Sequence, residues 1–134
     1  DVIGGQVDGM FDQTNTALPQ ITEAKVRPLA VTSAVRVPQL KDVPTLAETV
    51  VPGFEAATWY GIYAPKGTPP AAVEKVQQAY LNVMADKAFT ARLTAQAIQM
   101  LPPEQYTASA LGKHTASEVA RWKQLAAKAN ISLD

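Results

Sequence analysis

Apolar and polar positions alternate near the start of the chain in a pattern that predicts a strand, a helix and a second strand. Residues 7–11 follow the two-residue period of a strand with one buried face. The polar residues 12–16 suit a turn and a helix cap, so a short helix is expected over 17–24. Residues 27–32 again favour a strand. This order predicts an α/β fold with a parallel sheet and a right-handed crossover.

A proline-rich segment separates this unit from the next expected strand. Three prolines within residues 33–53 leave room for a helical turn or two over 45–49. In that turn Thr45 is the expected N-cap and Glu48 its reciprocal partner in a capping box. Residues 57–64 are rich in aromatic and β-forming side chains, which predicts a buried strand.

The remainder of the chain has the pattern of helices. Apolar residues recur at three- and four-residue spacing through 73–84, and Asp86 is expected to start a further short helix. A short edge strand is expected over 97–101. A last helix is expected over 103–129, with Trp122 on its apolar face and directed into the core.

Composition excludes several classes of function. Twelve acidic and twelve basic residues cancel, so the chain lacks the clustered positive charge that drives nucleic-acid binding. The longest apolar runs fall far short of the roughly 20 residues that cross a bilayer. The chain has no cysteine and a single histidine, His114, without the neighbours needed for a zinc site or a Ser-His-Asp triad. We therefore expect no catalytic residue, no metal and no cofactor, and we do not expect an enzyme.

The predicted strands are too few for a self-contained domain. At most four are expected, in two groups, whereas an ordinary sheet has about five or six. The first residues include neither an initiator methionine nor a signal peptide. These features lead us to expect that the chain starts inside a larger gene product or follows a removed segment, and that half of the fold is missing.

Several sequence blocks resemble a known family. The blocks are residues 4–12, 29–33 with Arg36, 42–45, 47–48, 52–55, 59–65, 67–69 and 118–122. In this order and at these separations they resemble the tripartite tricarboxylate transporter receptors, also called Bug proteins, over essentially all 134 residues. The resemblance implies part of a two-lobe, type II periplasmic binding protein fold.

The resemblance also implies how the chain is divided between the lobes. Residues 1–34 would form part of the second lobe as its strand–helix–strand unit, and residues 35–56 would connect the lobes. Residues 57–134, mostly helical, would return to the first lobe. The function implied is that of a periplasmic, extracytoplasmic receptor that captures a small carboxylate and delivers it to membrane permease subunits. The carboxylate could be a di- or tricarboxylate, an amino acid or an aromatic acid.

The candidate ligand-binding residues lie in the loop after the first expected strand. Ligands of open α/β sheets bind at the carboxyl ends of strands, and helix N-termini favour anions. We single out Asp12, Gln13 and Thr14, with Phe11 as a wall of the cleft. Each has an alternative role: Asp12 as a helix cap, Phe11 in the core, and the other two as solvated loop residues. Residues 13–15 depart from the pattern of many family members, which leaves the identity of the ligand open.

Two further expectations concern partners. Because half of the cleft would be missing, the chain alone should bind ligand weakly or not at all. Its uncovered faces should lead to self-association or to pairing with the missing N-terminal half. The alternative function is a stand-alone small α/β protein-interaction module without a ligand, whose last helix or strand edge docks a partner.

Overall fold

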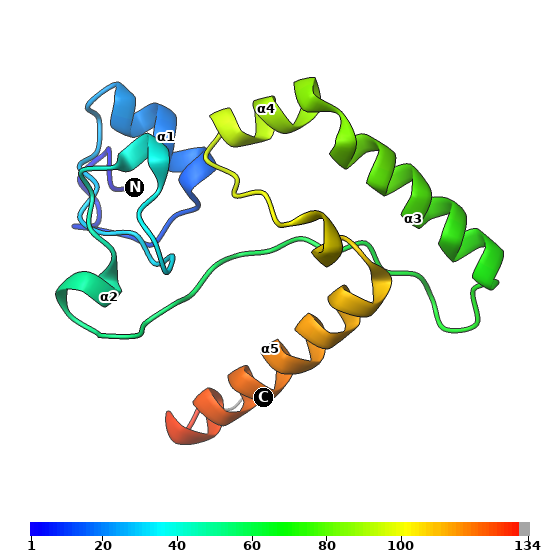
Figure 1. Ribbon diagram of the computed structural model, residues 1–134. Helices are drawn as coiled ribbons and strands as arrows, with labels where there is room; N and C mark the ends of the chain where they lie inside the picture. Colours follow the sequence, from blue (N-terminus) through cyan, green and yellow to red (C-terminus); the bar gives the residue numbers. More distant parts are fainter. Residues whose placement is uncertain (132–134) are drawn as a thin grey trace. The chain divides into compact units, whose positions relative to one another are not determined.

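Five α-helices and two short 3-10 helices make up the regular secondary structure of residues 1–131, which the computed structural model describes (Figure 1). Their bounds are α1 Thr14–Thr22, η1 Pro38–Leu40, α2 Leu46–Thr49, α3 Pro70–Ala85, α4 Lys87–Ala95, η2 Pro103–Gln105 and α5 Ala108–Lys128. No helix within residues 1–131 is long and apolar enough to cross a bilayer.

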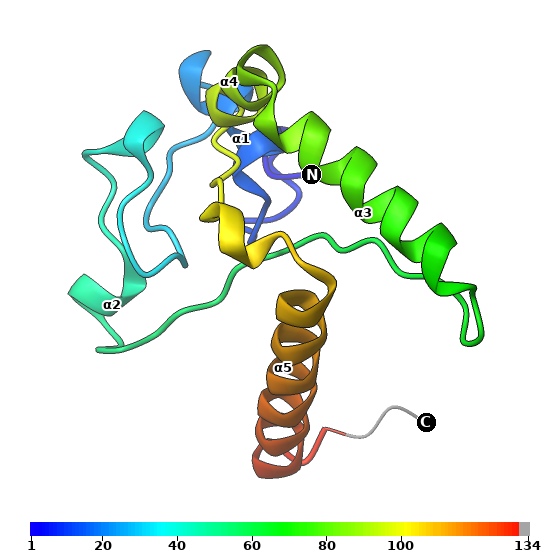
Figure 2. The same cartoon turned by 45° about the vertical axis from the view of Figure 1, so that its right-hand side comes forward.

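The chain divides into two units. Unit 1 contains residues 1–60 and 86–100, with helices α1, η1, α2 and α4. Unit 2 contains residues 61–85 and the chain from Leu101 onward, with α3, η2 and α5. The two long helices of unit 2 are drawn in green and orange in Figure 2. The chain passes between the units three times, after Tyr60, Ala85 and Met100.

The predicted helices are confirmed, with shifted ends. The helix expected over 17–24 is α1, which starts three residues earlier. Asp86 is the N-cap of α4 as expected, because its Oδ1 accepts hydrogen bonds from the backbone N–H groups of Ala88 and Phe89 at 2.8 and 3.1 Å. The helix expected over 103–129 is divided into η2 and α5. At α4 the capping signal therefore predicted the start of the helix correctly.

The predicted sheet pieces are not confirmed within residues 1–131. None of the expected strands, 7–11, 27–32, 57–64 and 97–101, is present there as a strand. The β structure of the described residues is an isolated parallel bridge between Val31 and Thr45. An extended segment becomes a strand only when a neighbouring segment completes a ladder of hydrogen bonds. Residues 27–32 find such a neighbour at a single position.

Thr45 is the best-buried residue of unit 1, with 1% of its surface exposed. The bridge beside it is closed by two backbone hydrogen bonds of 2.9 Å, from Val31 N to Pro44 O and from Leu46 N to Val31 O. Thr45 Oγ1 accepts from Glu48 N at 3.1 Å, while Thr45 N donates to Glu48 Oε2 at 2.7 Å. The predicted capping box is therefore formed, and it fixes α2 to the bridge.

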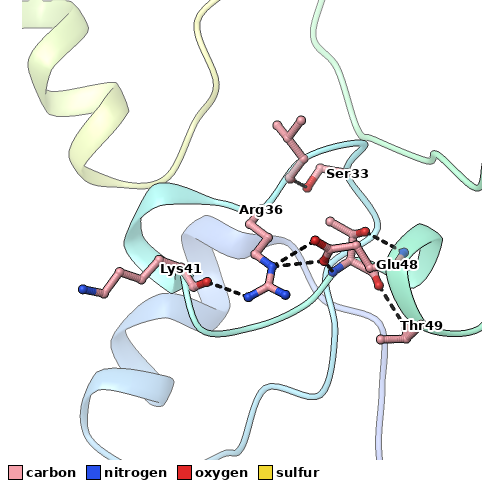
Figure 3. A network of polar contacts seen from close by, with 7 residues as sticks. Ser33, Arg36, Lys41, Glu48 and Thr49 are labelled. Atoms are coloured by element: carbon pink, nitrogen blue, oxygen red, sulfur yellow. Dashed lines mark hydrogen bonds and ion pairs between the residues drawn. The ribbon is translucent and has the colours of Figure 1, made fainter.

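Arg36 extends this network (Figure 3). Its Nε lies 3.2 and 3.0 Å from the two carboxylate oxygens of Glu48, and its Nη1 donates to the carbonyl of Lys41 at 3.1 Å. The hydrogen bond from the Thr45 backbone, and then the one from Arg36, hold the pKa of Glu48 below its ordinary value of 4.5. The guanidinium group thereby connects α2 to the loop that follows η1.

Unit 2 is held by contacts of tyrosine side chains. Thr115 Oγ1 donates to the carbonyl of Leu111 at 2.8 Å and lies 2.7 Å from Tyr63 Oη, so the tyrosine is the donor of that second hydrogen bond. The rings of Tyr80 and Tyr106 meet edge to face at 5.8 Å between centroids. Burial, and then the neighbouring Tyr106, raise the pKa of Tyr80.

The start of α5 is capped from two directions. Thr107 is its N-cap, and its Oγ1 accepts from Ala110 N at 3.1 Å. The side chain of Gln77 on α3 accepts from Ala108 N at 3.2 Å. A side chain of α3 therefore satisfies a backbone donor of α5 that has no partner within its own helix.

The expectation that Trp122 lies in the core is wrong for this structure, because 53% of its surface is exposed. Its indole N–H donates to Glu118 Oε2 at 3.0 Å, and the Arg121 guanidinium lies 5.7 Å from the ring centroid. Val119 and Leu125 on the same helix are also exposed, at 48% and 43%. The helical period predicted the apolar face of α5 correctly, but within residues 1–131 these side chains are not buried.

The capping box gives a first prediction. Thr45→Val keeps the size of the side chain but removes the hydroxyl that caps α2. We expect the free energy of unfolding of the full-length gene product to fall by about 1–2 kcal/mol, as is usual for a lost cap. Urea unfolding measures the change. Thr49→Val is the matched control: Thr49 is an exposed residue whose hydroxyl donates to the Thr45 carbonyl and caps no helix, so a change within about 0.5 kcal/mol is expected. Equal losses in both variants would contradict the role of the cap.

The lowered pKa of Glu48 gives a second prediction. A carboxyl group with a depressed pKa in the folded state contributes stability above its unfolded pKa and loses it as pH falls through the folded pKa. The loss should therefore occur below about pH 4.5, the ordinary value for Glu48. In Glu48→Gln the decline in urea stability below that pH should be shallower than in the wild type. Identical pH profiles would contradict the lowered pKa of Glu48, and with it the hydrogen bonds from the Thr45 backbone and Arg36 that cause it.

Candidate functional site

The candidate site is the N-terminal end of α1. Gln13 is the N-cap residue, with extended backbone angles, and its carbonyl accepts from Thr16 N and Ala17 N at 3.1 and 3.0 Å. The polar stretch predicted to cap this helix is therefore in place. The Gln13 side chain makes no capping hydrogen bond, so this end of the helix is organised by the residue before it.

Asp12 organises the helix end from outside. Its Oδ1 accepts from Gln13 N at 2.8 Å and from Thr16 Oγ1 at 2.9 Å. The expected capping role is thus modified: Asp12 stabilises the first turn through these two donors, while Gln13 occupies the N-cap position. The first turn of α1 contains no acidic residue of its own. The Asp12 carboxylate places a negative charge beside the positive end of the helix dipole.

The Gln13 side chain is oriented by a residue far away in the sequence. Tyr60 Oη donates to Gln13 Oε1 at 2.8 Å across 47 positions of the chain. An amide whose oxygen accepts a hydrogen bond presents its NH₂ group as a donor. Tyr60 was not among the predicted site residues. The aromatic segment 57–64 was visible in the sequence, but no local pattern indicates which residue its hydroxyl group contacts.

Thr14 and Phe11 flank this cluster. Thr14 is the first residue of α1 and is half-buried. Phe11 is 85% exposed, which excludes core packing for it within this structure. The structure therefore brings Asp12, Gln13 and Tyr60 together through Gln13, with Thr14 adjacent in the chain. Whether Phe11 forms a wall of a cleft stays a prediction.

This arrangement offers hydrogen-bond donors together with one negative charge. The Gln13 amide, a threonine hydroxyl and the helix end suit a carboxylate oxygen. The Asp12 carboxylate disfavours an anion placed directly beside it, so it suits a ligand ammonium group or an intervening water. These donors would suit a small carboxylate on the Gln13 side, away from Asp12.

Other candidate sites are weaker. Within residues 1–131, no group of three or more histidine, cysteine or acidic side chains is arranged to hold a metal ion. His114 is exposed on α5. A shallow depression on α3 is lined by Ala71, Glu74, Lys75, Gln78, Ala79 and Asn82. All of these residues belong to one helix, so the depression is surface relief and not a cleft between elements.

Comparison with known proteins identifies the family. Residues 1–131 match the model of the tripartite tricarboxylate transporter family receptor. The UPF0065 protein in the tcbD-tcbE intergenic region of Pseudomonas sp. strain P51 is 39% identical over 128 residues, which cover 93% of this chain and 37% of that protein.

Solved structures agree with this match. The periplasmic binding protein BugD is 39% identical, with a TM-score of 0.90 over 98% of this chain and 44% of its own. MatC from Rhodopseudomonas palustris, with bound malate, is 34% identical, with a TM-score of 0.84 over 91% of this chain and 42% of its own. The R. palustris protein Rpa4515 with adipate is 32% identical, with a TM-score of 0.75 over 90% of this chain and 40% of its own.

The chain spans about two fifths of the length of these proteins. BugD is a periplasmic binding protein, in agreement with the fold class implied by the sequence blocks. The family consists of solute-binding receptors and not of enzymes. The chain belongs to the tripartite tricarboxylate transporter receptor family, the Bug proteins.

Proposed function

We propose that the protein containing this chain is a periplasmic receptor that captures a small carboxylate for a tripartite tricarboxylate transporter and delivers it to the membrane permease subunits. The main observation that supports this proposal is the family match over residues 1–131. The likeness to a protein with bound malate and to one with adipate supports a carboxylate ligand. Those proteins are more than twice as long as this chain, so the activity belongs to the full-length protein.

We infer that the ligand is a dicarboxylate. Malate and adipate share two carboxylate groups at different separations. One carboxylate would be bound at the N-terminal end of α1, through the Gln13 amide and the Thr14 hydroxyl. The other would be bound elsewhere in the full-length protein. A ligand that contacts both lobes of such a receptor stabilises the closed state through its higher affinity for that state.

The lobe assignment is part of this proposal. Residues 1–34 are assigned to the second lobe, 35–56 to the connector and 57–134 to the part that returns to the first lobe, whereas the compact units of the structure group residues 86–100 with 1–60. Large apolar side chains on both units are exposed, including Tyr60, Val76 and Trp122. Patches of this kind are usually covered by further protein. In the full-length protein, the rest of the two-lobe receptor would cover these side chains. In the chain by itself, a second copy would cover them.

The stand-alone interaction module is not favoured, because the family is one of solute receptors.

Ligand binding tests the proposal directly. Malate and adipate should each be titrated into the full-length gene product by calorimetry and by thermal unfolding. A ligand at 100 times its Kd should raise the free energy of unfolding by about 2.7 kcal/mol, and the melting temperature should rise accordingly. The control is 1,6-hexanediol, which has the length of adipate but no carboxylate. Equal stabilisation by the diol, or no stabilisation by either dicarboxylate, contradicts the proposed ligand class.

Asp12 provides a test of ligand chemistry. Asp12→Asn keeps the oxygen that accepts from Gln13 N and Thr16 Oγ1 but removes the negative charge. Because like charges repel, affinity for a dicarboxylate should rise by about threefold or more. Affinity for L-aspartate should fall, because its ammonium group loses a counter-ion. Asp42→Asn, the same charge change at another exposed position of unit 1, should alter neither affinity. A lower dicarboxylate affinity in Asp12→Asn would instead place Asp12 in contact with the ligand through water.

A further inference from the structure

We propose that Tyr60 is a positioning residue of the ligand site, which orients the Gln13 amide so that its NH₂ group donates to a ligand carboxylate. This inference rests on the proposed function. The observation that supports this role of Tyr60 is the hydrogen bond of 2.8 Å from Tyr60 Oη to Gln13 Oε1.

The orientation of the amide decides what Gln13 offers to a ligand. A glutamine side chain has an oxygen that accepts and a nitrogen that donates, and free rotation about its last bond exchanges them. A carboxylate ligand needs the nitrogen, because carboxylate oxygens only accept. The Tyr60 hydroxyl donates to the oxygen, and so directs the nitrogen toward other partners.

The backbone of Gln13 is held at the same time from the other side. Its N–H donates to Asp12 Oδ1 at 2.8 Å, and its carbonyl accepts from the first turn of α1. The main chain is therefore fixed by Asp12 and by the helix, and the side chain by Tyr60. A donor that is oriented before the ligand arrives loses less conformational freedom on binding, which raises affinity.

Tyr60 is free of a packing role that would compete with this contact. Its ring is 75% exposed, so the core of unit 1 does not require it. Tyr63, three positions later, uses its hydroxyl in another way, to donate to Thr115 in unit 2. The two tyrosines thus allow the same chemical change, Tyr→Phe, to be compared at the proposed positioning contact and at a contact outside the site.

The experiment measures dicarboxylate affinity in variants of the full-length gene product, with malate and adipate as probes. Gln13→Glu retains an acceptor for Tyr60 but replaces the donor by a negative charge, and it should weaken binding by about tenfold or more. Tyr60→Phe should weaken binding by about threefold to tenfold while leaving the melting temperature of the ligand-free protein unchanged. Tyr63→Phe should leave the affinity unchanged.

A double-mutant cycle separates positioning from a general structural effect. Tyr60→Phe should weaken binding in the wild-type background but have no further effect in the Gln13→Ala background. A structural role of Tyr60 would give the same loss in both backgrounds, and this result would overturn the inference. An NMR readout independent of affinity is the side-chain NH₂ pair of Gln13, which should shift on ligand addition in the wild type and shift less in Tyr60→Phe.

The outcomes distinguish this inference from the function on which it rests. Dicarboxylate binding by the wild type with unchanged affinity in Tyr60→Phe and Gln13→Glu would overturn the inference and leave the proposed function standing. Absence of dicarboxylate binding by the wild type would defeat the proposed ligand class, and the inference with it.

Discussion

Unit 1 depends on the backbone and side chain of Thr45. This residue pairs with Val31 in the parallel bridge, caps α2 through its hydroxyl and donates its N–H to Glu48. Glu48 in turn binds Arg36, which reaches the Lys41 carbonyl. A single buried threonine is therefore connected to Val31 and Glu48 directly, and through Glu48 to Arg36 and the Lys41 carbonyl. A buried polar group without a hydrogen-bond partner lowers the stability of the folded state. A shift in register between η1 and α2 would leave the buried Thr45 without its partners, so this arrangement favours one register.

Most of the specific contacts in this structure are polar, because few apolar side chains of the described residues are buried. Within the described residues Val43 is the buried hydrophobic side chain, whereas large side chains such as Phe11, Tyr60 and Leu29 are 85%, 75% and 72% exposed. Folded domains gain most of their stability from apolar surface removed from water, at about 25 cal/mol per Å². Hydrogen bonds contribute less on balance, because they replace bonds to water. The contacts described for both units therefore define geometry more than they supply stability.

The same distinction explains what the sequence could predict. The capping box at Thr45 and the cap at Asp86 depend on residues within one turn, so both were predictable in detail. The apolar face of α5 follows from its period, but the burial of Trp122 depends on what packs against it, and periodicity does not contain that information. The predicted strands are not confirmed for a similar reason, because a strand forms only when a second segment supplies the hydrogen bonds of its ladder. At the candidate site, Asp12 and Gln13 were predictable as loop residues before a helix, whereas the contact of Gln13 with Tyr60 spans 47 positions and has no local signature.

The charged side chains of unit 1 bear on how an anion would be recognised at the candidate site. Two of the cations of unit 1 are committed to acidic partners: Lys25 lies 2.6 Å from Glu23, and Arg36 lies 3.0 Å from Glu48. The nearest charge at the helix end is the negative carboxylate of Asp12. A carboxylate bound as proposed would meet the neutral donors of Gln13 and Thr14 at this helix end. Neutral donors act over short distances and discriminate by geometry, whereas a cation attracts any anion. A receptor built in this way would select its ligand by the positions of the carboxylate oxygens, and a side chain that orients one donor, as proposed for Tyr60, would contribute to that selection.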